Sequence, residues 1–173
     1  MQQSEYLKGR VMALRSRHKG HDKYKSRITN LFNVYDNVSD PAEQAHNAKY
    51  LAVLVSGYLE QAIKELLLHY TFQGARPQIS RYIEETWPIS RNMNTQNIND
   101  ILGQFNSKWS EDFLYWLEQD DNRKSNINSI VRWRNGIAHG QESNTTGVTL
   151  VSVRNAFSTI GDLVSFIDGK VKS

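Results

Sequence analysis

The pattern of hydrophobic and polar positions has helical spacing along most of the chain. The clearest case is the stretch AKYLAVLVSGYLEQAIKELLLHY, residues 48–70, whose apolar side chains cover almost the whole circumference between Tyr50 and Val55. Apolar residues on all sides are typical of a helix at the centre of a bundle. We therefore expect a long central helix that starts at Pro41 after a cap at Ser39 or Asp40 and stops near Gly74.

Shorter helical patterns fill the rest of the chain. They cover residues 4–37, 79–86, 97–105, 110–119, 120–140 and 148–171. Gly20 could interrupt the first pattern, and the Val and Thr residues at 148–153 could begin as a strand. With only three prolines and 39% hydrophobic residues, these patterns predict an all-α helical bundle that forms a single domain over residues 1–173.

Charge is distributed unevenly along this bundle. Residues 1–35 hold eight basic and two acidic residues, residues 36–121 hold six and thirteen, and residues 122–173 hold seven and three. The basic N-terminal helical segment, about 1–37, has the charge expected of an RNA-binding surface, although solvated helix faces show the same pattern. We interpret HKGH, residues 18–21, as part of this surface. The candidate RNA-binding residues are Arg10, Arg15, Arg17, Lys19, Lys23 and Lys25.

Several functional classes are excluded or disfavoured by the composition. The chain has no cysteine, so it can have no disulfide, cysteine-based zinc site or thiol nucleophile. The first thirty residues lack the apolar core of a signal peptide, and we see no apolar run approaching the roughly 18 residues of a membrane span. We expect a cytoplasmic protein without membrane association.

The stretch RWRNGIAHG, residues 132–140, concentrates the candidate chemistry. On a helix Asn135 and His139 lie about 40° apart, and Arg134 can bend toward the same place. Arg134 borders an apolar stripe and should be partly buried. Gly136 suggests that something approaches the backbone closely, and Gly140 suggests where the helix stops. The expected stripe consists of Ile127, Ile130, Val131, Ile137 and Ala138.

These residue types suit phosphoryl transfer without a metal or another cofactor. Histidine can take a proton from a ribose 2′-hydroxyl or give one to the leaving 5′-oxygen. Arginine can hold the phosphate oxygens and stabilise charge, and asparagine can orient either group. No carboxylate pair lies near Arg134, Asn135 and His139 in the sequence to hold Mg²⁺. An Arg-His pair on a helix is, without further context, more often structural.

Arg134 and His139 with four intervening residues resemble the Arg-x4-6-His motif of the HEPN superfamily. The position of RNGIAHG near the end of an all-helical chain and the earlier LVSGYLEQAIKELL are similar to the RiboL-PSP-HEPN type over residues 40–170. This resemblance implies a motif on the penultimate helix and a two-fold homodimer in which two motifs line one cleft. The implied interface lies along residues 45–69 and 126–139, with small or apolar positions at Ala52, Val53, Val55, Ser56, Gly57 and Gly136.

The resemblance also implies function. Many HEPN proteins are metal-independent endoribonucleases of toxin-antitoxin or antiviral defence systems, which leave 2′,3′-cyclic phosphate ends. By this likeness Arg134, Asn135 and His139 are the catalytic residues, RNA is the substrate, and an antitoxin or regulatory protein is the partner. Glu60 is a possible supporting residue that partners Arg134 or fixes the histidine tautomer, or it pairs with Lys64. The alternative is a non-catalytic HEPN module that dimerises and binds RNA or nucleotide.

Overall fold

The computed structural model describes residues 20–87 and 92–172. In chain order the elements are α2 (Gly20–Tyr35), α3 (Pro41–Gly74), α4 (Pro77–Thr86), α5 (Thr95–Phe105), α6 (Ser107–Glu118), α7 (Asp121–Ala138), the 3-10 turn η1 (Glu142–Thr145) and α8 (Leu150–Lys172). These described residues contain no strand, so the all-α class is confirmed. The alternative strand at 148–153 is wrong, because most of this segment belongs to the first turn of α8.

Helix α3 is the predicted central helix. Asp40 caps its first turn by accepting a hydrogen bond from the backbone N–H of Glu43 at 2.8 Å, and Pro41 follows the cap. The helix ends at Gly74, as predicted. Its side chains are buried around most of the circumference, which explains the apolar pattern without a polar stripe. Among those with no exposed surface are Leu51, Val55, Leu59, Ile63, Leu66 and Leu67.

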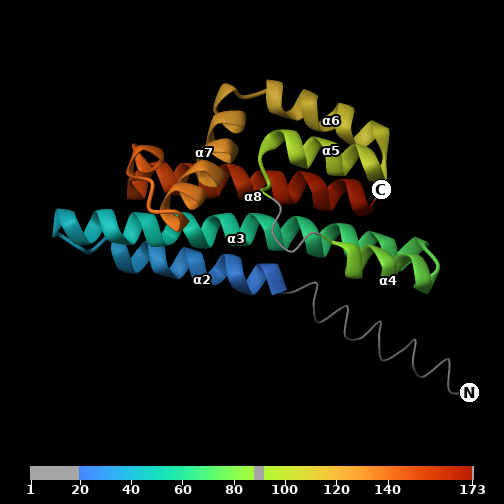
Figure 1. Cartoon of the computed structure of the whole chain (residues 1–173), viewed down its shortest axis with the longest axis horizontal. Helices are drawn as coiled ribbons and strands as arrows, with labels where there is room; N and C mark the ends of the chain where they lie inside the picture. Colours follow the sequence, from blue (N-terminus) through green and yellow to red (C-terminus); the bar gives the residue numbers. More distant parts are fainter. Residues whose placement is uncertain (1–19, 88–91, 173) are drawn as a thin grey trace, which may run out of the picture.

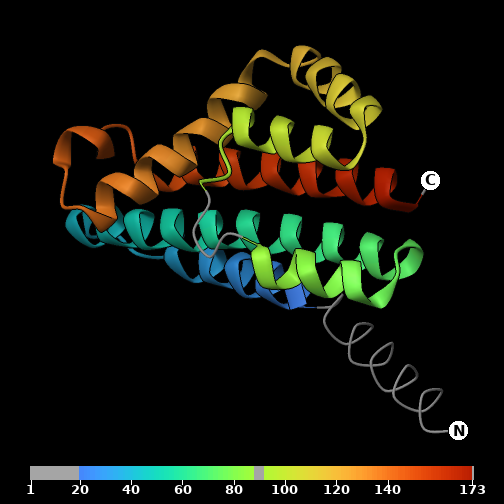
Figure 2. The ribbon, with the colours of Figure 1, turned by 45° about the vertical axis from the view of Figure 1, so that its right-hand side comes forward.

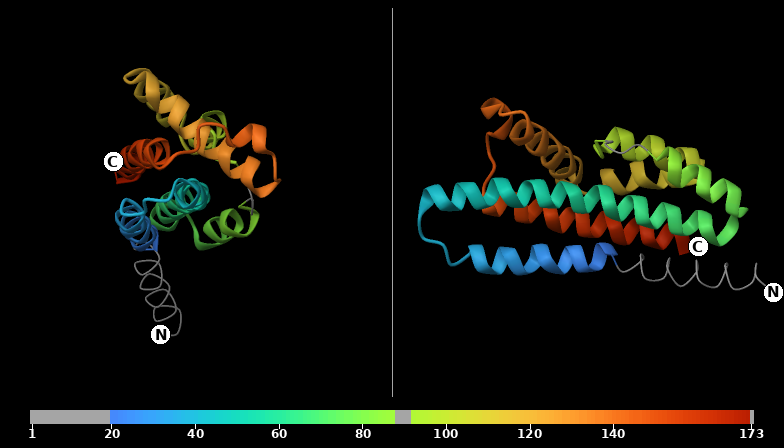
Figure 3. Two further views of the ribbon diagram at one scale, coloured as in Figure 1. Left: turned by 90° about the vertical axis from the view of Figure 1, so that its left-hand side faces the viewer. Right: turned by 60° about the horizontal axis from the view of Figure 1, so that its bottom comes forward.

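The other helices pack around α3. Helix α8 lies beside it and runs in the same direction, α2 packs on another side in the opposite direction, and α7 crosses the first half of α3 (Figures 1 and 3). Helices α5 and α6 lie over α8 (Figure 2), where Phe113 and Trp116 of α6 pack against Phe166 of α8. The end of α7 and the turn η1 lie together at one end of the bundle (Figure 1).

Helix α2 is attached to α3 by a buried polar pair. His21 is only 7% exposed, and its Nδ1 lies 2.8 Å from Oε2 of Glu65. The same carboxylate oxygen accepts the backbone N–H of His21, and Gln61 donates to the other oxygen. The interpretation of His21 as part of an RNA-facing surface is therefore wrong, since its ring is buried against α3. His18 lies outside the described residues.

Helix α8 is long and apolar enough to cross a membrane, judged by length and composition alone. The expectation that no apolar run approaches this length is therefore wrong for α8. In the bundle many of its apolar side chains face the core, whereas Val151 is exposed. Phe157 packs on Phe32 of α2 and Tyr58 of α3, with ring centroids 5.7 and 5.8 Å away, and Ile160 and Ile167 are completely buried. These contacts pack one side of α8 against α2 and α3.

Candidate functional site

His139 is the first residue after α7 and is exposed to solvent. Beyond it Gly140 has φ +63°, and the N–H of Gln141 bonds back to the carbonyl of Gly136 at 2.8 Å. This is a Schellman arrangement, in which a residue with positive φ closes the helix and glycine adopts that conformation without strain. The predicted helix stop is confirmed, and it leaves the imidazole at an open helix end.

Gly136 is needed because the chain folds back over it. A Cβ at this position would lie 2.7 Å from Cβ of Asn144 and 3.2 Å from the carbonyl oxygen of Gln141. A Cβ atom essentially never lies as close as 2.7 Å to another side chain, so an added Cβ would force Asn144 to move. The interpretation of Gly136 as the point where a second subunit approaches is therefore wrong, because the neighbour that requires the space is the turn η1 of the same chain.

The small residues expected at the dimer interface on α3 are also used within the chain. Ala52, Val55 and Ser56 are at most 1% exposed. A Cβ on Gly57 would lie 2.8 Å from the hydroxyl oxygen of Tyr24 on α2. These positions pack the protomer and leave no surplus apolar surface of their own. The homodimer remains a prediction, and it no longer rests on these residues.

Arg134 is half-buried on α7, as expected for a residue that borders the apolar side of the helix. Its Nη1 donates a hydrogen bond to Oδ1 of Asn135 at 3.1 Å. The packing stripe differs in part from the prediction. Ala138 is exposed, and Trp133 is buried instead, with its indole N–H donating to the carbonyl of Thr146 in the following loop. The buried residues that do follow the prediction are Ile127, Ile130 and Val131.

Glu60 of α3 lies beside Arg134. Burial raises the pKa of the Glu60 carboxyl, whereas the positive charge of Arg134 and a hydrogen bond from Ser56 lower it, and the net pKa shift is upward. The electrostatic effect of Arg134 means that the two side chains are close enough to interact. In the part of the chain that the structure describes, no ion pair or hydrogen bond joins Glu60 to Arg134, so Glu60 as a partner of Arg134 stays a prediction that this electrostatic effect supports. Among the described residues, no hydrogen bond joins Glu60 to His139, and no ion pair joins it to Lys64.

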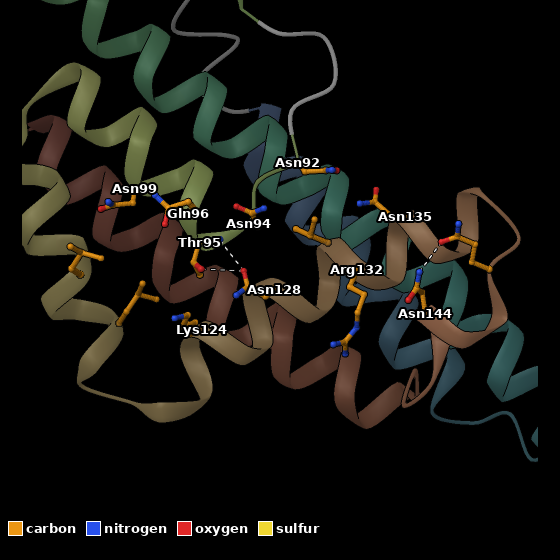
Figure 4. Close-up of a pocket in the computed structure, with 14 residues that line it drawn as sticks. Asn92, Asn94, Thr95, Gln96, Asn99, Lys124, Asn128, Arg132, Asn135 and Asn144 are labelled. Carbon is orange, nitrogen blue, oxygen red and sulfur yellow. Dashed lines mark hydrogen bonds between the residues drawn. The ribbon is translucent and has the colours of Figure 1, made fainter.

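Helices α5, α6 and α7 border a groove of about 760 Å³ (Figure 4). Amide side chains dominate its wall, Lys124 and Arg132 contribute positive charge, and none of the described side chains that line it is Asp or Glu. Asn135 belongs both to this groove and to the hydrogen bond with Arg134. This groove is not among the sites that the sequence predicts. A detectable signal was the density of Asn and Gln in residues 92–99 together with Asn128 and Asn135 on one face of α7.

The basic residues predicted to bind RNA are not brought to the motif by the described structure. Arg10, Arg15, Arg17 and Lys19 lie outside the described residues. Lys23 and Lys25 are exposed on α2, which packs on a different side of α3 from α7 (Figures 1 and 3). Within one protomer these two lysines are therefore separated from Arg134 and His139 by α3.

The motif itself offers a limited set of chemical groups. His139 can transfer a proton, Arg134 carries a permanent charge, and Asn135 is a hydrogen-bonding amide. Among residues 20–87 and 92–172, no three His, Cys, Asp or Glu side chains come together in a way that could hold a metal ion. The groups that are present suit acid-base chemistry on a bound anion.

An all-α bundle whose penultimate helix ends in Arg-x4-His has the arrangement of a HEPN domain. The family model described as RiboL-PSP-HEPN matches residues 22–173, and the chain belongs to this family. The matched region begins inside α2. The family domain therefore includes most of α2, which lies before the resemblance over residues 40–170. HEPN domains are generally RNases that bind RNA and dimerise. In the comparisons with curated proteins and with solved structures, nothing matches the chain.

Proposed function

We propose that this chain is a metal-independent endoribonuclease that acts as a homodimer in a toxin-antitoxin or antiviral defence system. The observation that carries the proposal is the placement of Arg134 and His139 at the open end of α7, with Asn135 hydrogen-bonded to the arginine. An exposed imidazole at the end of the helix that also carries a hydrogen-bonded guanidinium offers the two groups that a phosphodiester needs. Membership of a family whose domains are generally RNases supports the same reading.

The proposed reaction is an internal attack by the ribose 2′-hydroxyl on the neighbouring phosphorus. His139 accepts the 2′-hydroxyl proton as the new P–O bond forms, and the bond to the 5′-oxygen breaks. A second copy of His139, across the two-fold axis of the dimer, donates the proton that the 5′-oxygen needs. Arg134 stabilises the charge that gathers on the non-bridging oxygens. The products carry a 2′,3′-cyclic phosphate and a 5′-hydroxyl.

Product analysis on purified protein in excess EDTA tests this chemistry. We expect an unpaired RNA to be cleaved with cyclic phosphate ends, and the same strand to survive when every sugar is deoxyribose, because the internal nucleophile is then missing. Ends with a 3′-hydroxyl and a 5′-phosphate would overturn the mechanism. Loss of cleavage in EDTA that returns with Mg²⁺ would overturn metal independence.

The proposed role in defence has its own experiment. Induced expression of the native chain in a bacterial host should arrest growth, and His139→Ala should not. A growth-arresting nuclease requires restraint, so an antitoxin or regulatory partner is part of the proposal. Equal growth with both chains would contradict a toxin role and leave the ribonuclease chemistry to be judged by its products.

A non-catalytic HEPN module is the second candidate. The observation that favours it is that Arg134 already interacts with Glu60 and Asn135 within the chain, as a purely structural arginine would. In this case His139→Ala would leave RNA binding and dimerisation unchanged, and the native chain would yield no cleaved product.

A further inference from the structure

The amide groove beside the motif is built to present hydrogen-bond donors. On its half-buried wall Asn94, Asn128 and Asn135 each use the side-chain carbonyl inside the protein. Oδ1 of Asn94 accepts the N–H of Asn97, and Oδ1 of Asn135 accepts from Arg134. The orientation of these amides is fixed because the groups that they accept from can only donate.

The side-chain oxygen of Asn128 is also used for hydrogen bonds within the protein. Its Oδ1 accepts the backbone N–H of Thr95 at 2.9 Å and the Thr95 hydroxyl at 3.2 Å, as Figure 4 shows. The NH₂ groups of Asn94, Asn128 and Asn135 have no partner among the described residues. Each of them can donate two hydrogen bonds to a ligand. At Asn94, Asn128 and Asn135 the wall therefore offers donors, whereas the side-chain oxygen of each already accepts a hydrogen bond within the protein.

The charge and shape of the groove favour an acceptor-rich, anionic ligand. Lys124 and Arg132 are exposed at its edge, and Leu117 and Val131 give it apolar surface. Lys124 and Asn135 are eleven residues apart on α7, which corresponds to about 16 Å of helix. The groove is therefore long enough for more than one nucleotide, and Asn135 joins it directly to the motif.

We infer that this groove binds the unpaired RNA strand next to the cleaved linkage and selects uracil and guanine, whose exocyclic group at O4 or O6 is a carbonyl oxygen, over cytosine and adenine, whose group at N4 or N6 is an amino group. The inference rests on the proposed ribonuclease function for its substrate. Guanine O6 and uracil O4 accept hydrogen bonds, whereas adenine N6 and cytosine N4 donate them. An amino group that faces the NH₂ of Asn128 would leave two donors opposed, and such a mismatch is costly when buried.

The test compares two RNA strands that differ at one exocyclic group. Oligouridylate and oligocytidylate of equal length, with 2′-O-methyl groups on every sugar, lack the internal nucleophile and report binding alone. We expect the full-length native chain to bind the uridine strand about 10-fold more tightly, as judged by fluorescence anisotropy. Equal affinity for the two strands would overturn the inference.

Asn128→Asp is the decisive variant. It keeps an oxygen for the two hydrogen bonds from Thr95, so the fold is preserved, but it replaces the NH₂ donors by an acceptor. The preference for uridine should fall to about equality or reverse, because a carboxylate accepts from cytosine N4. Asn155→Asp, on the exposed side of α8, adds the same charge away from the groove and should keep the preference. An unchanged preference in Asn128→Asp would overturn the assignment of the groove.

Cleavage assays on unmodified RNA separate this inference from the proposed function. Cleavage without any uridine preference in binding would remove the groove inference and leave the ribonuclease in place. A preference that Asn128→Asp abolishes, in a chain that cleaves no RNA, would support the groove as a binding site and remove the catalytic proposal.

Discussion

Arg134 on α7 and Glu60 on α3 interact electrostatically across the interface between the two helices. Burial raises the pKa of the Glu60 carboxyl, and the guanidinium of Arg134 works against that rise. The arginine is itself half-buried and donates a hydrogen bond to Asn135. A charged pair of this kind can set the position of the arginine that the proposed reaction uses.

Glu60→Gln tests the positioning role of this carboxyl. The amide keeps an oxygen for Ser56 but carries no charge, so Arg134 should become more mobile and kcat should fall by about 10-fold. Because the raised pKa belongs to Glu60, the acidic limb of the pH profile of kcat should flatten in the variant. Glu118→Gln, at the exposed end of α6, is the matched control. Unchanged kcat and an unchanged acidic limb would show that Glu60 is only structural.

Gly136→Ala should destabilise the loop that follows the motif. The added Cβ would meet Cβ of Asn144 at 2.7 Å, so η1 must move, and overpacking of this kind costs about 1 to 3 kcal/mol. Gly169→Ala, within α8 and with no atom within 4 Å of the new Cβ, should instead raise stability by up to about 1 kcal/mol. Urea unfolding of both variants measures the difference, and equal effects would contradict this account of Gly136.

The helices could be predicted from the sequence because their signals are local. The apolar circumference of residues 48–70, the cap at Asp40 and the stop at Gly140 each depend on residues within a turn or two of one another. His21 could not be interpreted in the same way. Its partner Glu65 is 44 positions away, and only the packing of α2 on α3 brings the two together.

The motif could be predicted from the sequence, whereas its surroundings could not. Arg134 and His139 follow a local spacing, but the reason for Gly136 depends on how the chain returns after Gly140. The groove depends on amides from α5 and α7 that meet only after α5, α6 and α7 have packed. Small residues on α3 were assigned to a subunit interface because a sequence pattern does not distinguish contacts within a chain from contacts between chains.

The His21–Glu65 pair should make stability depend on pH. The folded pKa of His21 is raised above 6.5, chiefly by its hydrogen bond to Glu65, so its contribution is complete below pH 6.5 and is lost as pH rises through the folded pKa. For Glu65, burial raises the pKa, but the bonds from His21 and Gln61 outweigh it and lower the pKa below 4.5. That contribution is present above pH 4.5 and is lost as pH falls through the folded pKa.

Both contributions coexist between about pH 4.5 and 6.5. Glu65→Gln should therefore lower the free energy of unfolding by about 2 kcal/mol at pH 5.5 and by less at pH 8.5. Glu85→Gln, which removes an exposed pair with Arg81, should cost under about 0.5 kcal/mol at either pH. A deficit in Glu65→Gln that does not change between the two pH values would contradict the ionic part of the pair.

The basic N-terminal segment should strengthen RNA binding without selecting the sequence. Arg15, Arg17 and Lys19 can neutralise phosphates, so replacing all three by glutamine should weaken binding and reduce the slope of log affinity against log salt by about two units. The preference for uridine over cytidine should stay the same, because it depends on the groove. Titrations at several salt concentrations measure both quantities, and an unchanged slope would remove this segment from the RNA contact.

Replacing Arg134 and replacing His139 should have different effects on stability and cleavage. His139 is exposed, and among the described residues only its backbone is hydrogen-bonded, so His139→Ala should stay folded while cleavage falls by about 10²- to 10⁴-fold. Arg134→Ala should lower cleavage by about 10²- to 10³-fold and should also destabilise the fold, because Glu60 would keep a half-buried charge without its partner. Combining Arg134→Ala with Glu60→Gln should restore much of the stability but none of the cleavage. Thermal unfolding and single-turnover rates on the three chains separate the two effects, and the catalytic assignment of Arg134 fails if the double variant recovers activity along with stability.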